Sequence, residues 1–314
     1  MIYKKYCFIA YCLSVFCMAL LAVSCNGRRP QPAAPVVVPR VFLPAIAPSE
    51  LPPDERLEWM RWHYWDRFDF ADTLFLTEAD STQMLQAFAD YIGLLSFDPT
   101  DGAPMDSLMH KASVSRKMLD YFGWMSDEVI HDPNSPLRND EFYIPVLRAK
   151  LASPYYDEYE RIRPEYELKI ASQNRVGHPA NDFRYTLASG KTGTLYALEA
   201  EYVLLFINNP GCPMCREIRE SIQASPMLTE MIERGRLIVL ALYPDEELDE
   251  WRRYCEQIPA TWINAYDAGC RIRENDLYNL VAIPALYLLD RNKRVLVKDS
   301  VDVALIEEVI DRAG

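Results

Sequence analysis

The chain contains 314 residues, of which 50% are apolar and 25% are charged. This composition is typical of a globular protein and excludes a disordered chain, a collagen-like repeat and a multi-span membrane protein. The 33 basic and 46 acidic residues give a formal net charge of −13, so no nucleic-acid partner is expected. Since a domain averages about 150 residues, the length predicts two domains.

Residues 1–24 have the pattern of a secretory signal peptide. Lys4 and Lys5 form a short basic region, and an apolar run follows over residues 6–23. The five residues that end at Cys25, Leu-Ala-Val-Ser-Cys, resemble a bacterial lipoprotein processing site, which implies that Cys25 is acylated and becomes the first residue of the mature chain. An uncleaved anchor is the alternative, because the apolar run approaches the length of a membrane span. Under both interpretations the chain leaves the cytosol.

Residues 25–53 are predicted to form a linker. Between Pro30 and Pro53 the sequence has eight prolines and no glycine. Proline at this density does not pack as a helix or a central strand, so we expect a semi-rigid, extended spacer. Behind an acylated cysteine, such a spacer holds a soluble body away from a membrane surface.

A small, mostly α-helical domain is predicted over residues 54–175. Apolar residues recur at helical spacing at Met84, Leu85, Phe88, Ile92 and Leu95, and again at Met105, Leu108, Ala112, Leu119 and Phe122. Proline and glycine mark breaks at residues 99–102 and 132–136. The aromatic stretch 59–70 is interpreted as core rather than as a binding groove. His63 within it has no neighbouring His or Cys with which to bind a metal.

From residue 176 to residue 314 the pattern changes to alternating strands and helices, which predicts an α/β domain. Strands are expected over 183–187, 193–198, 202–207, 237–243, 285–289 and 295–297. Helices are expected over 214–225, 246–257 and 303–311. The continuous apolar runs indicate strands covered on both faces, and the last two strands form a hairpin. We therefore expect a mixed central sheet with helices on both faces.

The sequence Cys212-Pro213-Met214-Cys215 follows the buried strand 202–207 and opens a predicted helix. At that place the first sulfur lies at a helix N-terminus, where unpaired N–H groups stabilise a thiolate. We therefore assign Cys212 as the exposed nucleophile and Cys215 as the buried resolving thiol. A structural disulfide between these two cysteines, which never opens, is the alternative that the sequence leaves open.

Three segments of residues 176–314 resemble a TlpA-type thioredoxin-like domain: residues 177–183, residues 206–215 with the C-x-x-C motif, and residues 281–290 with an Ile-Pro pair. Domains of this type are envelope thiol-disulfide oxidoreductases and are often membrane-tethered. The resemblance implies a cis peptide bond before Pro284, whose loop would pack beside the cysteine pair and keep metal ions away from it. It further implies that Ile283 presents its backbone to a substrate, with Pro213 and Met214 beside it as docking residues.

The chain departs from the thioredoxin pattern in three places. The middle dipeptide is Pro-Met instead of Gly-Pro, and Asn209-Pro210-Gly211 replaces the usual tryptophan before the first cysteine. Many thioredoxins also bury an acid six residues before the nucleophile as a proton relay, and here that position is Phe206. Glu199 or Glu201 is a candidate to take over this role.

The first half of the chain resembles an uncharacterised domain that precedes thioredoxin-like domains in some bacterial envelope lipoproteins. The segment from His63 to Phe70 carries this likeness, which brings no known activity. Position in the chain suggests substrate selection or spacing.

Cys255 and Cys270 are fifteen positions apart. They either close a loop as a second disulfide, worth about 3 kcal/mol, or are two buried thiols; the second interpretation is favoured. A zinc site usually needs a second close pair, which these two do not supply, so neither a metal nor another cofactor is expected.

The resulting hypothesis is a lipid-anchored, periplasm-facing envelope thiol-disulfide oxidoreductase. Its expected partners are substrate proteins with disulfides or thiols, a membrane electron donor, and the membrane itself through the anchor. One alternative is a redox-inactive binding module that uses the thioredoxin fold as a scaffold. A thiol peroxidase is a weaker alternative, because residues 210–215 lack the threonine that such enzymes place beside the reactive cysteine.

Overall fold

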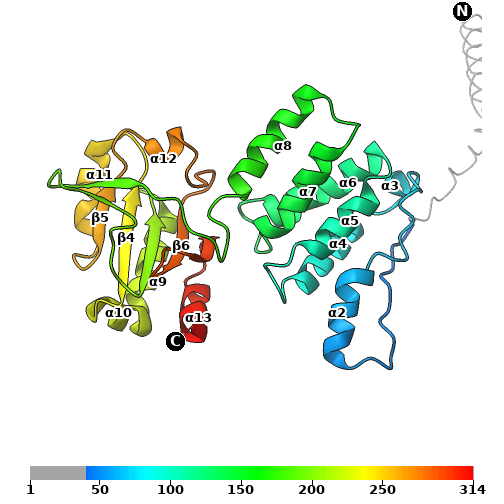
Figure 1. Cartoon of the computed structure of the whole chain (residues 1–314), viewed down its shortest axis with the longest axis horizontal. Coiled ribbons are helices and arrows are strands. Elements are labelled where there is room, and N and C mark those ends of the chain that lie inside the picture. The colour runs from blue at the N-terminus through cyan, green and yellow to red at the C-terminus, as the bar shows by residue number, and fades with distance from the viewer. Residues whose placement is uncertain (1–39, 314) are drawn as a thin grey trace, which may run out of the picture. The chain divides into compact units, whose positions relative to one another are not determined.

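Two kinds of architecture follow one another in the part of the chain that the computed structural model describes, residues 40–313 (Figure 1). Helices occupy the sequence up to Ala171, and a sheet with flanking helices follows from Arg184. The predicted signal peptide, the lipidation site Cys25 and residues 25–39 of the predicted linker lie outside the described residues. Among residues 40–313, none of the helices combines the length and the apolar character needed to cross a bilayer.

The helical region confirms the periodicity of the sequence. Its elements are α2 (Pro53–His63), α3 (Phe75–Glu78), α4 (Ser81–Leu95), α5 (Ala103–Ala112), α6 (Arg116–Ser126), the π-helical segment η1 (Asp127–His131), α7 (Asp140–Ala152) and α8 (Glu158–Ala171). Polar side chains fix the starts of the longer helices: Asp80 accepts N–H bonds at the start of α4, and Asn139 does so at the start of α7. Both predicted breaks fall between helices.

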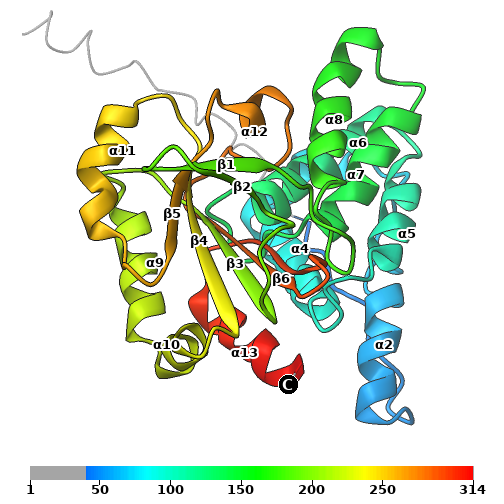
Figure 2. The same cartoon turned by 60° about the vertical axis from the view of Figure 1, so that its left-hand side comes forward.

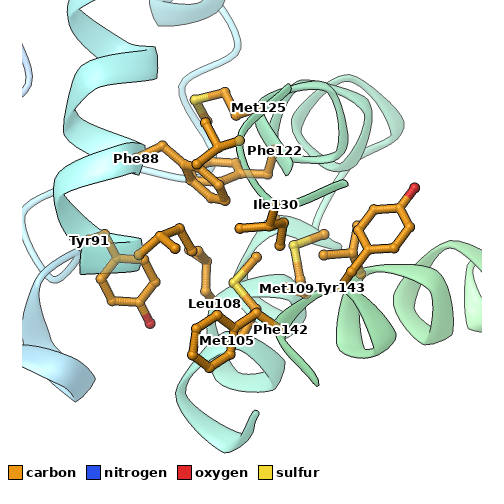
Figure 3. Close-up of a cluster of buried hydrophobic side chains, with 14 of the residues drawn as sticks. Phe88, Tyr91, Met105, Leu108, Met109, Phe122, Met125, Ile130, Phe142 and Tyr143 are labelled. Atoms are coloured by element: carbon orange, nitrogen blue, oxygen red, sulfur yellow. The ribbon is translucent and has the colours of Figure 1, made fainter. Parts of the chain in front are cut away.

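Aromatic and methionine side chains fill the core of the helical region (Figure 3). Trp65 is buried and its ring packs at right angles to those of Phe122 and Phe68. Tyr64 and Phe68 are buried as well, which confirms the interpretation as core for this part of the aromatic stretch, whereas Trp62 is 40% exposed. His63 is half-buried and stacks on Trp59, and its Nδ1 lies 2.6 Å from Asp66 Oδ2; it is not among the side chains of that core.

The last part of the predicted linker belongs to this core. Phe42 stacks on Trp65 with ring centroids 4.6 Å apart, and the Ala45 N–H donates to the Tyr64 carbonyl at 3.1 Å. Packing against the helices therefore begins about ten residues before the boundary expected at residue 54. The sequence does not reveal this, because the apolar residues among the prolines carry no helical or strand period.

A seven-stranded mixed sheet in the order β2-β1-β5-β4-β3-β6-β7 organises the second region (Figure 2). The strands are β1 (Arg184–Leu187), β2 (Thr192–Thr194), β3 (Tyr202–Ile207), β4 (Leu237–Tyr243), β5 (Ile263–Tyr266), β6 (Ala285–Asp290) and β7 (Val295–Ser300). Strands β3, β4 and β5 run parallel, and the other pairings are antiparallel. The central strand β3 is buried at all six positions.

Helices and loops cover both faces of this sheet, as expected. The helices are α9 (Pro213–Ala224), α10 (Pro226–Glu233), α11 (Leu248–Tyr254) with the 3-10 turn η2 (Cys255–Gln257), α12 (Arg271–Glu274) and α13 (Val303–Ala313). Because side chains alternate along a strand, Leu204 and Phe206 of β3 join the apolar cluster of α9, α10 and α13. Val203 and Leu205 join the opposite cluster, which includes Ile272 of α12.

Three elements were not predicted, and one strand was predicted too long. Strand β5 and helices α10 and α12 carry no clear period. Ser225 ends α9, and its Oγ accepts the Leu228 N–H at 3.0 Å, so one residue closes α9 and starts α10. The strand expected over 193–198 ends at Thr194, because Leu195 turns into the core.

Ion pairs connect helix α7 to the last strand within residues 41–314, which form one structural unit. Arg138 Nη2 lies 2.5 Å from Asp299 Oδ2, and Lys298 Nζ lies 2.7 Å from Asp140 Oδ2. All four side chains are largely buried. Buried ions are tolerated when they are paired, so these contacts tie the start of α7 to β7.

Candidate redox site

The site lies at the carboxyl end of β3, where the chain leaves the sheet and enters α9. The loop over residues 208–212 is held by Asn209, whose Nδ2 donates to Asp245 Oδ2 at 3.1 Å. Gly211 has a φ of 73°, which a residue with a Cβ adopts only at a cost. This explains why glycine stands immediately before the first cysteine.

Cys212 is the N-cap of α9 and is half-buried. The Cys215 N–H donates to Cys212 Sγ at 3.1 Å, so the sulfur occupies the place that a serine or aspartate oxygen takes at other helix starts. Pro213 occupies the first helical turn, where a missing N–H costs nothing. The Cys215 N–H and the positive end of the helix dipole therefore both point at this sulfur.

Cys215 is fully buried in the cluster on that face of the sheet. Burial, and after it the hydrogen bond with Cys212, raises the pKa of the Cys215 thiol to about 12. The two thiols of the motif are therefore unequal: one is accessible at a helix start, and the other is protonated and sequestered. This is the asymmetry that the predicted roles of nucleophile and resolving thiol require.

The Ile-Pro segment lies directly beside Cys212, although about seventy residues separate them in sequence. The peptide bond between Ile283 and Pro284 is cis, and the Ile283 carbonyl oxygen lies 3.9 Å from Cys212 Sγ. Met214 is 48% exposed on the same loop–helix corner. The structure thus brings together Cys212, Cys215, Pro213, Met214, Ile283 and Pro284.

The glutamates considered as substitutes for a buried acid lie away from the site. Glu201 precedes β3 and pairs with Arg236, whereas Cys212 follows the other end of that strand. Six strand residues at about 3.3 Å each separate the two ends by roughly 20 Å. Glu199 also precedes β3, so neither glutamate serves the cysteine pair.

Sequence reasoning missed two buried polar side chains behind the motif, Arg219 and Tyr254. Arg219 Nη1 donates to Tyr254 Oη at 2.9 Å, and its guanidinium lies 5.6 Å from the centre of the Tyr254 ring. One signal was available. Arg219 follows Cys215 by four residues and so lies on the apolar face of α9 with Ile218 and Ile222.

Cys255 and Cys270 are free thiols in the structure. Cys270 is buried and Cys255 is half-buried, and burial raises the pKa of both thiols. The second disulfide considered in the sequence analysis is therefore not formed here, and the interpretation as two separate thiols fits the structure.

Comparison with solved structures identifies the whole arrangement. A thioredoxin-like protein from Bacteroides caccae has 42% sequence identity and a TM-score of 0.80, over 87% of this chain and 99% of that chain. This protein belongs to the thioredoxin-like proteins. Its first region matches the family described as a domain of unknown function (DUF5106) over residues 31–174.

Two further solved structures each match less than half of this thioredoxin-like protein. The C-terminal domain of an uncharacterised protein from Bacteroides fragilis has 48% identity and a TM-score of 0.43, over 44% of this chain and 98% of that chain. The thioredoxin domain of a thiol-disulfide oxidoreductase from Bacteroides vulgatus has 17% identity and a TM-score of 0.39, over 45% of this chain and 99% of that chain. The chain has no match among curated proteins.

Proposed function

We propose that the protein is a thiol-disulfide oxidoreductase that exchanges disulfides through Cys212 and Cys215. The observation that carries this proposal is the placement of Cys212 Sγ. It accepts the Cys215 N–H at the start of α9 and faces the Ile283 carbonyl 3.9 Å away. A sulfur used as inert packing needs neither a helix N-terminus nor an open side toward a cis-proline loop.

The reaction has two displacement steps. In the first, the Cys212 thiolate attacks a substrate disulfide, forms a mixed disulfide and releases one substrate thiolate, which takes up a proton. In the second, Cys215 loses its proton and attacks Cys212 Sγ, so that the second substrate sulfur leaves as a thiolate. The substrate disulfide gains two electrons, the cysteine pair becomes a disulfide, and an external dithiol donor must reduce it again.

The substrate contacts in this proposal come from the exposed rim of the site. The Ile283 backbone and the Met214 side chain border the accessible face of Cys212. An extended segment of a substrate protein would lie along this rim and place its disulfide against the sulfur. Reduction or isomerisation of protein disulfides is the reaction class that suits a half-buried sulfur beside an exposed side chain.

We further propose that the protein is a TlpA-type envelope lipoprotein that faces the periplasm and receives electrons from a membrane donor. The supporting observations are the signal-like pattern of residues 1–24, Cys25 behind it, and the proline-rich stretch that follows. Metabolic labelling of intact cells with a fatty acid tests the anchor. Wild-type protein should incorporate the label, and the Cys25→Ala variant should not.

The redox function is tested by equilibrating the purified protein with defined glutathione mixtures. A reduction potential near about −270 mV would mark a reductase, and one near about −120 mV an oxidant. Cys212→Ser and Cys215→Ser should abolish the equilibrium, whereas the matched control Cys255→Ser, outside the motif, should keep it. If the wild-type pair never exchanges with glutathione or with protein disulfides, the redox proposal fails and a scaffold role replaces it.

A further inference from the structure

Arg219 is a buried cation without a carboxylate partner among residues 40–313. Its side chain is 7% exposed and contacts two neutral groups, Tyr254 Oη at 2.9 Å and Gln257 Oε1 at 3.5 Å. Removing a charge from water is costly unless it is paired, so buried arginines normally meet an acid. The uncompensated charge of Arg219 is therefore available to stabilise a negative charge that forms nearby.

The cysteine pair supplies such a charge. Arg219 follows Cys215 by one helical turn, and side chains of a helix lean toward its N-terminus, which here is the end that carries the cysteines. Tyr254 packs in the same apolar cluster as Cys215 and Phe206. Its hydroxyl accepts a hydrogen bond from Arg219, and its own hydrogen has no acceptor among residues 40–313.

Tyr254 interacts electrostatically with the arginine and with both thiols. Burial raises the pKa of Tyr254, the Arg219 cation lowers it, and charge on Cys215 and on Cys212 raises it again. Arg219, Cys215 and Cys212 are the charged or titratable groups that act on Tyr254. The other neighbours, Gln257, Phe206 and Trp262, are neutral. Its raised pKa keeps the Tyr254 phenol protonated, so its hydrogen is free to be donated to a charge that forms nearby.

The resolving step requires a group that stabilises the Cys215 thiolate. The thiolate is the attacking form, and a thiol with a pKa of about 12 is almost wholly protonated at neutral pH. The hydrogen bond with Cys212 and the charge on Cys212 both raise this pKa, and both change once Cys212 is bonded to a substrate sulfur. Burial of Cys215 remains, and the thioredoxin position for a buried acid is Phe206, which offers no base.

We propose that Tyr254, polarised by Arg219, stabilises the Cys215 thiolate while that thiolate attacks the mixed disulfide. In this step Cys215 releases its proton to solvent, a bond forms between the two cysteine sulfurs, and the bond from Cys212 to the substrate sulfur breaks. The substrate sulfur leaves with the electron pair and takes up a proton. Arg219 acts through Tyr254 and is thus a positioning residue. The proposal rests on the redox function proposed above.

Ellman's reagent separates the two steps in the full-length protein. Attack by reduced Cys212 releases one coloured thiolate and leaves a mixed disulfide, and resolution by Cys215 releases the second. Ellman's reagent also reacts with other free thiols, so every variant is made in a background in which the six cysteines outside the motif are replaced by serine. Stopped-flow traces over a range of pH then give one rate for Cys212 and one for Cys215. We expect Tyr254→Phe and Arg219→Met to slow the second phase on the order of tenfold at neutral pH, which corresponds to a rise of about one unit in its apparent pKa. The first phase should change far less.

Three variants distinguish a charge effect from a packing effect. Arg219→Lys keeps the cation and should recover most of the second-phase rate that Arg219→Met loses. Arg216→Gln removes an exposed charge next to Cys215 on the same helix and should leave both phases nearly unchanged, because solvent screens it. Tyr254→Phe removes one oxygen and keeps the ring. If Arg219→Met fails to fold, this variant alone shows whether the second phase depends on the Tyr254 hydroxyl.

The outcomes separate this inference from the proposed function. If the wild-type protein releases no second thiolate, the redox function itself fails. If wild-type resolves normally, and Tyr254→Phe resolves at the same rate with the same apparent pKa, the inference is wrong while the redox function stands. An Arg219→Lys variant as slow as Arg219→Met would likewise overturn the role of the charge.

Discussion

Arg61 in the helical region and Arg219 in the thioredoxin-like region are buried to the same extent, with 7% of each residue exposed. Arg61 donates to the carboxylates of Glu58 and Asp101, each at 2.7 Å. Arg219 donates to a phenol and an amide behind two thiols. A buried arginine that is paired with carboxylates stabilises the fold. A buried arginine without a carboxylate partner can still stabilise a negative charge that forms during a reaction. The buried arginine of the helical region therefore serves packing, whereas that of the thioredoxin-like region lies behind the cysteine pair.

The largest expected effect on stability comes from the core of the helical region. Trp65→Ala should lower the free energy of unfolding by about 3–5 kcal/mol, because six aromatic rings contact this side chain. Denaturant unfolding followed by circular dichroism measures the loss, with Trp62→Ala as the more exposed control. Disulfide exchange per folded molecule should stay unchanged. A parallel loss of exchange would show that the two regions are not functionally separable.

In the helical region, the stability should depend on pH through the carboxyl group of Glu167. Burial raises the pKa of Glu167, but the His131 ring 3.6 Å away and the hydrogen bond from Arg163 outweigh it and lower the pKa from 4.5 to about 2. A lowered carboxyl pKa adds stability above its unfolded value, and that stability is lost as the pH falls from about 4.5 to about 2.

Glu167→Gln should therefore lower the free energy of unfolding at neutral pH by at most about 3 kcal/mol. Denaturant titrations at several pH values measure it, and the gap between wild-type and variant should close in acid. A gap that persists at the lowest pH would mean that packing rather than charge explains it.

Arg61→Met tests the comparison between the two arginines directly. Removing this partner leaves two partly exposed carboxylates, so the free energy of unfolding should fall by about 1–2 kcal/mol. Both phases of the reaction with Ellman's reagent should match wild-type, unlike those of Arg219→Met. If Arg61→Met slows the second phase as much as Arg219→Met does, both variants lower that rate by destabilising the protein and not through a charge near Cys215.

The smallest expected effect lies in the loop before Cys212. Gly211→Ala should reduce stability by about 1 kcal/mol, because its φ of 73° disfavours a Cβ, while nothing lies within 4 Å of the added atom. Gly211→Asn should cost less, since asparagine tolerates this conformation. Equal melting temperatures for glycine and alanine would show that the loop relaxes freely around the site.

Several parts of this fold follow from local sequence alone. The run Tyr202–Ile207, the C-x-x-C spacing and the proline at the helix start predict a buried strand that delivers a thiol to a helix N-terminus, and the structure has that order. The aromatic stretch around Trp65 was also interpreted correctly as core. In each case neighbouring residues carry the signal, because strand and helix periods and cap residues act over a few positions.

Tertiary structure decided what distant residues do for one another. Phe42 is core because Trp65 meets it, and β5 is a strand because β4 pairs with it. Tyr254 of α11 shares an apolar cluster with Cys215, and its hydroxyl accepts a hydrogen bond from Arg219 of α9. Thirty-nine positions separate Cys215 from Tyr254, and no local pattern links them. The local pattern of the sequence was enough to place two thiols at the start of a helix. The packing of helices on the sheet determined which buried charge stands behind them, because electrostatic interactions depend on distance in space and not along the chain.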